Sequence, residues 1–527
     1  MEKLKPYVFL ILAGALYSLG YPTKISMSLI VTPIIGVSIL FYYILNEDSF
    51  KKRLLMLLCF NLSFNMISFY WIADTLMEFG QLPYPIALIL NALFTLIITP
   101  HFSAALITMH LFRSSLKSLR MNSVGLSSFL LALSLTLFEY FIPQQFNLFL
   151  GQPLIAVSKY LGFAHIAGLP IYSFFSYLLV FEIINIFQYK KFSYINYATI
   201  FIFILLNPIL VPDKNQGEVI QTNIRLVQAN ISNFLKIDSE KGTYASVDQV
   251  INRYQQLSMK RSYFLKSFDL IVWPETAFPY SMKVDNKNIN QTSLPNVVRD
   301  SAIQQDSQLF IGGYDSQSSP GSQSLFKTEH NTAFHISKSG ELIETYNKRI
   351  LIPFGETLPF GRFNKYISRY IENISFFKEG NKFTLFNLNN GSQFISTICY
   401  ELLKPRFIRE YLNSVKTRPH FMINLTNDSW YGKTMEPEQH LFLAKWRALE
   451  FNIPIIRSTN TGISSVIYPD ATESRRMGIF KTGNLDLKLS FSTNQATIYQ
   501  KWDILPLILL WVFYFIFHLL GIKLKDE

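Results

Sequence analysis

The sequence predicts a multi-span α-helical membrane domain joined to one large extramembrane α+β domain. Of its 527 residues, 49% are hydrophobic and only 16% are charged, whereas soluble domains carry roughly a quarter charged residues. Long apolar runs fill residues 1–212 and return within 502–527. Residues 213–501 instead show short β-rich runs alternating with amphipathic helices, which indicates a sheet covered by helices. We therefore expect three parts, with boundaries near 212 and 501.

Eight apolar runs are long enough to cross a membrane, because a helix needs about 20 mostly apolar residues to span the hydrocarbon core. The expected spans are 6–22, 25–45, 54–74, 85–112, 124–141, 163–187, 195–212 and 504–521. Segment 142–162 is apolar but broken by Gln, Gly and Pro, so we expect a re-entrant or interfacial connection. Glu139, inside an apolar run, has either a functional role or a structural hydrogen bond near a helix end.

Basic residues in the short loops predict the orientation of these spans. With the N-terminus inside, only Lys24 and Lys159 fall in outer short loops, against twelve basic residues inside: Lys3, Lys5, Lys51, Lys52, Arg53, Arg113, Lys117, Arg120, Lys190, Lys191, Lys523 and Lys525. Both termini are then cytoplasmic and 213–501 lies outside the cytoplasm. Because much of the basic excess marks inner loops and no nucleic-acid-binding motif is present, we expect no nucleic-acid partner.

The N-terminal run also has features of a secretory signal, since Lys3 and Lys5 precede apolar residues and Ala13-Gly14-Ala15 resembles a cleavage site. The apolar run continues beyond that site. We therefore expect an uncleaved first helix.

Three polar elements follow apolar strands in the extramembrane part. They are Trp273-Pro274-Glu275, Tyr346-Asn347-Lys348 and Cys399-Tyr400-Glu401. A thiol nucleophile needs a base, and a lysine stabilises both the thiolate and a developing oxyanion. Glu, Lys and Cys together thus make an acyl-transfer apparatus, although singly each has an ordinary explanation: a core thiol, a surface lysine or a helix-capping acid.

Cysteine and histidine usage narrows the chemistry further. The second cysteine, Cys59, lies within an apolar span, so Cys399 is an unpaired external thiol and no disulfide framework exists. The eight histidines show no close ligand spacing, so we expect neither a metal site nor a cofactor.

The order of motifs resembles the nitrilase superfamily, whose catalytic set is Glu-Lys-Cys. The motifs are WPE, YxK followed by PFGE, CYE, and NLTNDSWYG at 424–432. With seven helices before this domain and one after it, the chain is similar to the apolipoprotein N-acyltransferase family, also through QHLFLAKWRALE at 439–450 and RSTNTGISSVI at 457–467. The resemblance implies an αββα sandwich for 213–501.

The resemblance also implies roles for individual residues. Glu275 would be the general base, Lys348 the oxyanion-stabilising cation and Cys399 the nucleophile. Three further residues would orient or complete the site: Glu356, Glu401 and Tyr400. Expected substrate contacts are Phe234, Phe360 and Trp430. Ser232 and Ile237 depart from the family pattern, which has Pro and Trp there.

Family enzymes move an acyl chain from a phospholipid, through a cysteine thioester, to the α-amine of a diacylglyceryl-cysteine on a lipoprotein. They do so in the bacterial inner membrane, with the catalytic domain in the periplasm. The expected partners are therefore a phospholipid donor, a diacylated apolipoprotein acceptor and the lipid bilayer.

Two other functions remain open. A membrane-tethered amidase of the same superfamily would let water attack the thioester, although eight spans favour a lipid substrate. A non-catalytic membrane assembly or transport protein would have no need of an intact Glu-Lys-Cys set. The oligomeric state is not predicted, because apolar residues that face lipid and those that face a partner look alike.

Overall fold

The computed structural model describes residues 4–24, 28–78, 82–111, 124–190, 192–211, 219–282, 284, 294–316, 329–353, 355–358, 361–367 and 377–523. Its contacts divide the chain into two compact units. One comprises Met1–Asp213, Glu438–Phe451 and Ala496–Glu527, and the other Lys214–Pro437 and Asn452–Gln495. The sequence-based division placed 438–451 in the extramembrane domain, whereas here these residues group with the helical unit.

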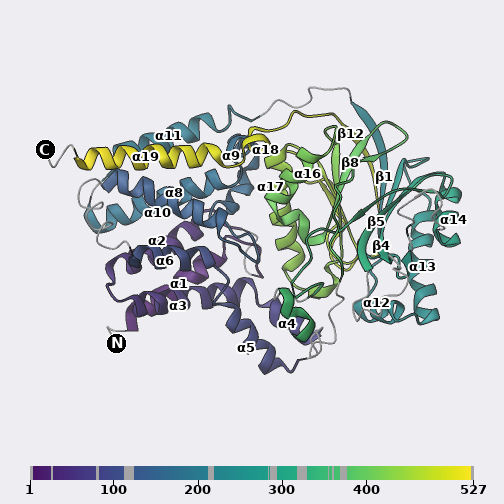
Figure 1. Cartoon of the computed structure of the whole chain (residues 1–527), viewed down its shortest axis with the longest axis horizontal. Helices are drawn as coiled ribbons and strands as arrows, with labels where there is room; N and C mark the ends of the chain where they lie inside the picture. The colour runs from purple at the N-terminus through teal and green to yellow at the C-terminus, as the bar shows by residue number, and fades with distance from the viewer. Residues whose placement is uncertain are drawn as a thin grey trace. The chain divides into compact units, whose positions relative to one another are not determined.

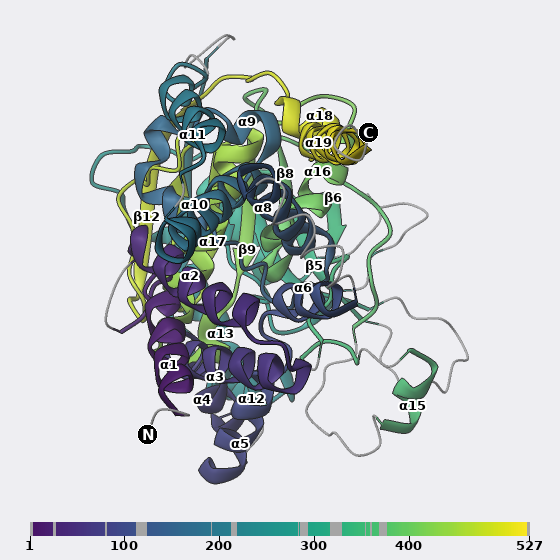
Figure 2. The same cartoon turned by 90° about the vertical axis from the view of Figure 1, so that its left-hand side faces the viewer.

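Close helix packing at small residues organises the helical unit. Helix α1 (Lys5–Ser18) packs against α2 (Val31–Asn46) and α3 (Phe50–Ser68), and α8 (Val124–Phe141) lies beside α10 (Pro170–Tyr189) and α19 (Leu505–Lys523) (Figures 1 and 2). A Cβ at Gly14 would lie 2.1 Å from the carbonyl oxygen of Phe60, so only glycine allows α1 and α3 to approach this closely. The other elements are α4 (Trp71–Glu78), α5 (Tyr84–Phe94), α6 (Pro100–Leu111), η2 (Gln152–Tyr160), α9 (Ala164–Ala167), α11 (Tyr194–Leu206), α17 (Glu436–Phe451) and α18 (Ile498–Trp502).

Breaks in the helices make most of them shorter than the apolar runs in the sequence. Among the described residues, one helix, Pro170–Gln188, is long and apolar enough to cross a membrane, and the pair α3 and α4, bent by 62°, adds a second if it counts as one span. The run 85–112 is divided into α5 and α6, and α6 begins at Pro100, which lacks the N–H needed to continue a preceding helix. The eight-span count therefore stays a prediction.

Segment 142–162 forms turns and the 3₁₀-helix η2. Glu139 Oε1 accepts hydrogen bonds from the backbone N–H of Leu150 at 3.0 Å and from the Tyr177 hydroxyl at 2.5 Å. The backbone N–H of Gly151 donates to Ser173 Oγ at 3.1 Å. Through these contacts Glu139 ties the irregular segment to α10. They fit the structural hydrogen-bonding role that was one of the two expectations for this residue.

Helix α17 is anchored in the helical unit by three polar side chains. The indole N–H of Trp71 donates to Gln439 Oε1 at 3.1 Å, and the Gln439 amide donates to the carbonyls of Pro22 and Ser68 at 2.8 Å. The indole of Trp446 and the carboxylate of Glu450 bond to backbone groups of segments 142–162 and 163–187. These contacts explain why 438–451 groups with the helical unit.

The second unit contains two β-sheets. The first has the order β12-β1-β2-β4-β5-β6, with β3 paired to β4, and the second has the order β11-β10-β9-β8-β7. Strands β1, β2 and β4 are parallel, as are β8, β9 and β10, while antiparallel strands extend each sheet. The bounds are β1 (Ile220–Gln228), β2 (Leu270–Trp273), β3 (Ser281–Met282), β4 (Gln308–Ser316), β5 (Glu329–Ile336), β6 (Leu342–Asn347), β7 (Phe386–Asn387), β8 (Gln393–Ile398), β9 (Phe421–Thr426), β10 (Ile455–Thr459), β11 (Ser465–Ile467) and β12 (Gly483–Phe491).

Aromatic side chains fill the space between the sheets. The rings of Phe310 and Phe394 lie 5.1 Å apart, and those of Phe421 and Phe491 lie 4.4 Å apart. Helices α13 (Tyr244–Met259) and α14 (Asn296–Gln305) cover the outer face of the first sheet with one apolar core. Helix α16 (Pro405–Ser414) packs on the second sheet, and its Tyr411 hydroxyl donates to the Thr384 carbonyl oxygen at 2.8 Å, just before β7. This αββα arrangement confirms the predicted nitrilase-like fold of the extramembrane part.

Candidate active site

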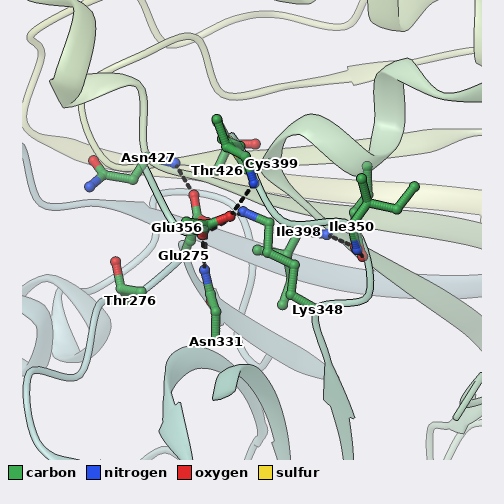
Figure 3. A network of polar contacts seen from close by, with 12 residues as sticks. Glu275, Thr276, Asn331, Lys348, Ile350, Glu356, Ile398, Cys399, Thr426 and Asn427 are labelled. Atoms are coloured by element: carbon green, nitrogen blue, oxygen red, sulfur yellow. Dashed lines mark hydrogen bonds and ion pairs between the residues drawn. The ribbon is translucent and has the colours of Figure 1, made fainter. Parts of the chain in front are cut away.

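Glu275 follows β2 in a turn that packs against β4. A Cβ at Gly312 would lie 2.4 Å from the Pro274 carbonyl oxygen and 2.7 Å from Glu275 Cα, so the turn needs a glycine opposite it. Glu275 is 6% exposed. Its Oε1 accepts hydrogen bonds from Lys348 Nζ at 3.2 Å and Asn331 Nδ2 at 2.9 Å (Figure 3). Its Oε2 accepts from the backbone N–H of Asn427 at 2.9 Å, so both carboxylate oxygens are held.

Lys348 lies directly after β6 and is completely buried. Its ammonium group bridges Glu275 and Glu356, with 2.8 Å between Nζ and Glu356 Oε1. Burial by itself would lower the pKa of Lys348, but the charges of these two glutamates outweigh it and raise the pKa above its usual value. Lys348 therefore stays charged. Two of its three N–H donors are used, which leaves one for a further acceptor.

Glu356 completes this network from the loop after Lys348. Its Oε1 also accepts from Asn331 Nδ2 at 3.1 Å, and its Oε2 accepts from the backbone N–H of Ile352 at 2.9 Å. Lys348 and Asn331 thus both bind the same two carboxylates, Glu275 and Glu356. These shared donors offset the repulsion between the two carboxylates, so the two acids can lie close together.

Cys399 stands between β8 and the 3₁₀-helix η6 (Cys399–Leu403). Its φ of +52° lies in the left-handed region, which is uncommon for residues other than glycine and recurs where a side chain is presented to a site. Asn424 Nδ2 donates to its carbonyl oxygen at 3.3 Å. Burial and the charge of Glu275 raise the pKa of the thiol, while the charge of Lys348 opposes them. At neutral pH the resting group is a thiol, and a base is needed to form the thiolate.

Glu401 holds the segments on either side of the site. Four groups donate to its carboxylate at 2.6–3.1 Å: the Tyr346 hydroxyl and the backbone N–H groups of Arg349, Ile350 and Ile398. Burial raises the pKa of Glu401 to about 7, although the three N–H groups act in the opposite direction. Through these contacts Glu401 fixes the chain that follows Lys348 and the strand end that precedes Cys399.

The remaining expected residues lie in varied surroundings. Tyr400 is buried, with Lys404 Nζ 4.4 Å from its ring centre. Trp430 is half-buried and its ring centre lies 5.9 Å from Lys236 Nζ. Phe234, on α12 (Asn233–Glu240), is 85% exposed. Phe360 lies outside the described residues.

Of the two residues that depart from the family pattern, Ser232 and Ile237, the structure gives Ser232 a clear local role. Ser232 is the N-cap of α12, with its Oγ accepting from the backbone N–H of Leu235 at 3.4 Å. A serine suits this position because its hydroxyl satisfies an N–H that lacks an intrahelical partner. Ile237 is half-buried on the same helix.

Sequence reasoning missed three contributors to the site. Asn331 is the third residue of β5 and had no motif to mark it. Asn427 belongs to the motif at 424–432, but nothing in that motif indicates that its backbone N–H donates to Glu275. Lys236 lies in the stretch after the first strand, and its only signal was a lysine on the inner side of a short amphipathic helix.

Comparisons with known proteins agree with this arrangement. Residues 223–498 match the carbon-nitrogen hydrolase family, and residues 13–181 match the apolipoprotein N-acyltransferase N-terminal domain. An apolipoprotein N-acyltransferase of Bdellovibrio bacteriovorus is 30% identical over 454 residues, which cover 83% of this chain and 80% of the relative. Those of Rhodopseudomonas palustris and Agrobacterium fabrum are 28% and 32% identical, and the matches span 51% and 42% of their lengths.

Among solved structures, an amidase from Nesterenkonia sp. has 16% sequence identity and a TM-score of 0.35, with 57% of this chain and 100% of the amidase covered. The fold assignment rests instead on the family matches and on the sheet topology described above. The Bdellovibrio relative matches 83% of this chain, and the two family models match its helical part and its Glu-Lys-Cys domain, so the chain belongs to the apolipoprotein N-acyltransferase family.

Proposed function

We propose that this chain transfers an acyl chain from a phospholipid, through a thioester on Cys399, to the α-amine of a diacylglyceryl-cysteine lipoprotein. Membership of the N-acyltransferase family supports the overall reaction. The single observation that carries the residue assignment is the network that joins Glu275, Lys348 and Glu356, with Cys399 close enough for their charges to act on its thiol.

Acylation begins with the Cys399 thiol. Glu275 takes its proton as Sγ attacks the sn-1 ester carbonyl carbon, and the negative charge moves to the carbonyl oxygen. The third N–H of Lys348, together with its fixed positive charge, stabilises that oxyanion. The ester C–O bond then breaks, and Glu275 returns the proton to the leaving oxygen. The products are the Cys399 thioester and a lysophospholipid.

Transfer to the lipoprotein repeats the same proton movements. The α-amine attacks the thioester carbonyl, Glu275 accepts a proton from the amine nitrogen, and the C–S bond breaks. The proton then returns to the cysteine thiolate, which leaves an amide on the lipoprotein and the enzyme in its starting state. Glu275 thus acts as base and then as acid in both halves.

The neighbouring residues act on this set indirectly. Glu356 and Glu401 position Lys348 and the Cys399 turn, and Tyr400 lies next to the nucleophile in the chain. Trp430 and Phe234 supply aromatic surface toward the lipid chains.

We further propose that the chain crosses a bacterial inner membrane eight times, with 213–501 as a periplasmic catalytic domain and both termini cytoplasmic. The twelve-to-two distribution of basic residues supports the orientation. The pair α3 and α4 and the shorter apolar helices of 10–17 residues in the described part of the chain support additional crossings. Attachment to the membrane suits a reaction whose two substrates are both anchored in lipid.

The test of this mechanism is whether an acyl adduct forms on Cys399. Purified full-length protein in detergent is incubated with a phospholipid that carries a labelled sn-1 chain, and the adduct is located by peptide mass spectrometry. The proposal expects a label on Cys399, none in Cys399→Ala, and an undiminished label in the matched control Cys59→Ala. A label that persists at another residue in Cys399→Ala, or no adduct in the wild-type protein, contradicts the mechanism.

A further inference from the structure

A second buried lysine lies beside Glu275. Lys236, on α12, is 7% exposed and lines a small pocket together with Glu275, Thr276 and Asn460. The mechanism above assigns no role to this residue. Its position next to Glu275 nevertheless places a positive charge at the edge of the Glu-Lys-Cys site.

Lys236 has few protein partners for an ammonium group at this depth. Its Nζ donates to the Thr276 hydroxyl. Glu240 Oε1 is 3.9 Å away, which is beyond hydrogen-bond distance, and that oxygen already accepts from the Tyr314 hydroxyl. Among the described residues no other hydrogen bond reaches Nζ. Two of its N–H donors therefore have no acceptor within the described part of the chain.

Such an arrangement is costly unless a ligand completes it. Buried ammonium groups are normally paired and hydrogen-bonded, because removal from water penalises the charge. Burial accordingly lowers the pKa of Lys236, while the charges of Glu240 and Glu275 act against it. The pocket at Nζ thus has the chemistry to receive an oxygen that carries negative charge.

We propose that Lys236 binds the phosphate of the phospholipid donor and so determines the preference for phospholipids over neutral glycerolipids. This inference rests on the proposed function. Of the two substrates, the acceptor presents an amine, which an ammonium group does not attract. The donor has a phosphodiester joined through glycerol to the ester that Cys399 attacks. Lys236 therefore acts in acylation, and the phosphate leaves with the lysophospholipid before the lipoprotein binds.

The experiment compares two donors with identical acyl chains, a phosphatidylglycerol and the corresponding 1,2-diacylglycerol, in the same mixed micelles. The initial rate of adduct formation on Cys399 is measured for wild type, Lys236→Met, Lys236→Arg and Lys241→Met. Lys241 is the C-cap of the same helix and is exposed, so Lys241→Met is the matched control. Lys236→Met keeps the apolar stem and removes the charge.

The proposal expects wild type to prefer the phospholipid, and Lys236→Met to lose about 10- to 100-fold of that preference, as for a hydrogen bond to a charged group. Lys236→Arg should restore most of the preference, and Lys241→Met should retain all of it. Adduct formation from diacylglycerol by Lys236→Met shows that the variant is folded.

Equal losses on both donors in Lys236→Met, or equal rates on both donors in wild type, would overturn the assignment. Slower transfer from the thioester to a diacylated lipopeptide with an unchanged donor preference would place Lys236 with the acceptor instead, and also overturn it. Failure of the proposed function itself looks different, because wild type would then form no Cys399 adduct with either donor.

Discussion

Replacement of Gly312 with alanine should displace the turn that carries Glu275 without removing any of its hydrogen-bond partners. The added Cβ would lie 2.4 Å from the Pro274 carbonyl oxygen and 2.7 Å from both Glu275 Cα and Thr276 N, whereas ordinary contacts begin near 3.4 Å. Because these neighbours are backbone atoms, the turn must move by about 1 Å. Such a shift would stretch the 2.9 and 3.2 Å bonds from Asn331 and Lys348 to Glu275.

A 1 Å misplacement costs about 100-fold in rate, and overpacking costs about 1–3 kcal/mol of stability. We therefore expect Gly312→Ala to form the Cys399 adduct about 100-fold more slowly in a single-turnover assay, with a cooperative thermal transition retained. Gly313→Ala is the matched control, since a Cβ there meets only side chains, none closer than 3.2 Å. Adduct formation at nearly the wild-type rate in Gly312→Ala, or an equal loss in Gly313→Ala, would refute this reasoning.

Three further predictions concern the polar network. Asn331→Leu removes the neutral donor shared by Glu275 and Glu356 and should slow acylation by about 10- to 100-fold; an unchanged single-turnover rate would exclude this positioning role. Lys348→Met leaves two buried carboxylates without their cation and should cost about 3–5 kcal/mol of stability; a variant as stable as wild type in denaturant titration would contradict the ion-pair assignment. Burial raises the pKa of Glu401 from 4.5 to about 7, so the folded chain keeps a proton that the unfolded chain releases. Its stabilising contribution is full below about pH 4.5 and should fall by about 3 kcal/mol as the pH rises through 7; Glu401→Gln should abolish that slope, and an identical pH dependence in both proteins would contradict it.

Local patterns predicted most elements of the extramembrane unit. Strands such as β2 and β8 are short apolar runs that end at polar motifs, so their limits could be placed to within a few residues. Strand β12 was missed although Leu485, Leu487, Leu489 and Phe491 alternate along it, with outward positions more exposed. The eight-residue helix α12 was also missed, because so short a helix has little periodicity to detect.

The helical unit shows what local patterns do not contain. The apolar runs marked the helices, but the bend between α3 and α4 and the division of 85–112 depend on tertiary packing. The motif at 439–450 lies within helix α17 (Glu436–Phe451), which fits the amphipathic helices expected for 213–501. Its grouping with the helical unit depends on hydrogen bonds between Gln439 and both Trp71 and Pro22, which are hundreds of residues away in the chain.

The candidate site divides in the same way. Glu275, Lys348 and Cys399 could be proposed because each lies directly after an apolar strand or one residue beyond it, where polar side chains are presented to a site. Their meeting from two different sheets, after β2 and β6 of the first and β8 of the second, is a tertiary feature that no local pattern contains. The other groups that hold Glu275 could not be proposed. Asn331 lies in a strand that carries no catalytic motif. Asn427 donates through its backbone N–H, which every residue except proline has, so the residue type does not indicate this contact.

The most direct test of the central claim follows one labelled acyl chain through Cys399. Protein loaded with a labelled acyl thioester is freed of donor lipid and mixed with a synthetic diacylated lipopeptide that has a free α-amine, and both products are quantified by mass spectrometry. The account predicts that the label leaves Cys399 at the rate at which it appears as an amide on the lipopeptide. Release of the label mainly as free fatty acid, or lipopeptide acylation by Cys399→Ala, would contradict it.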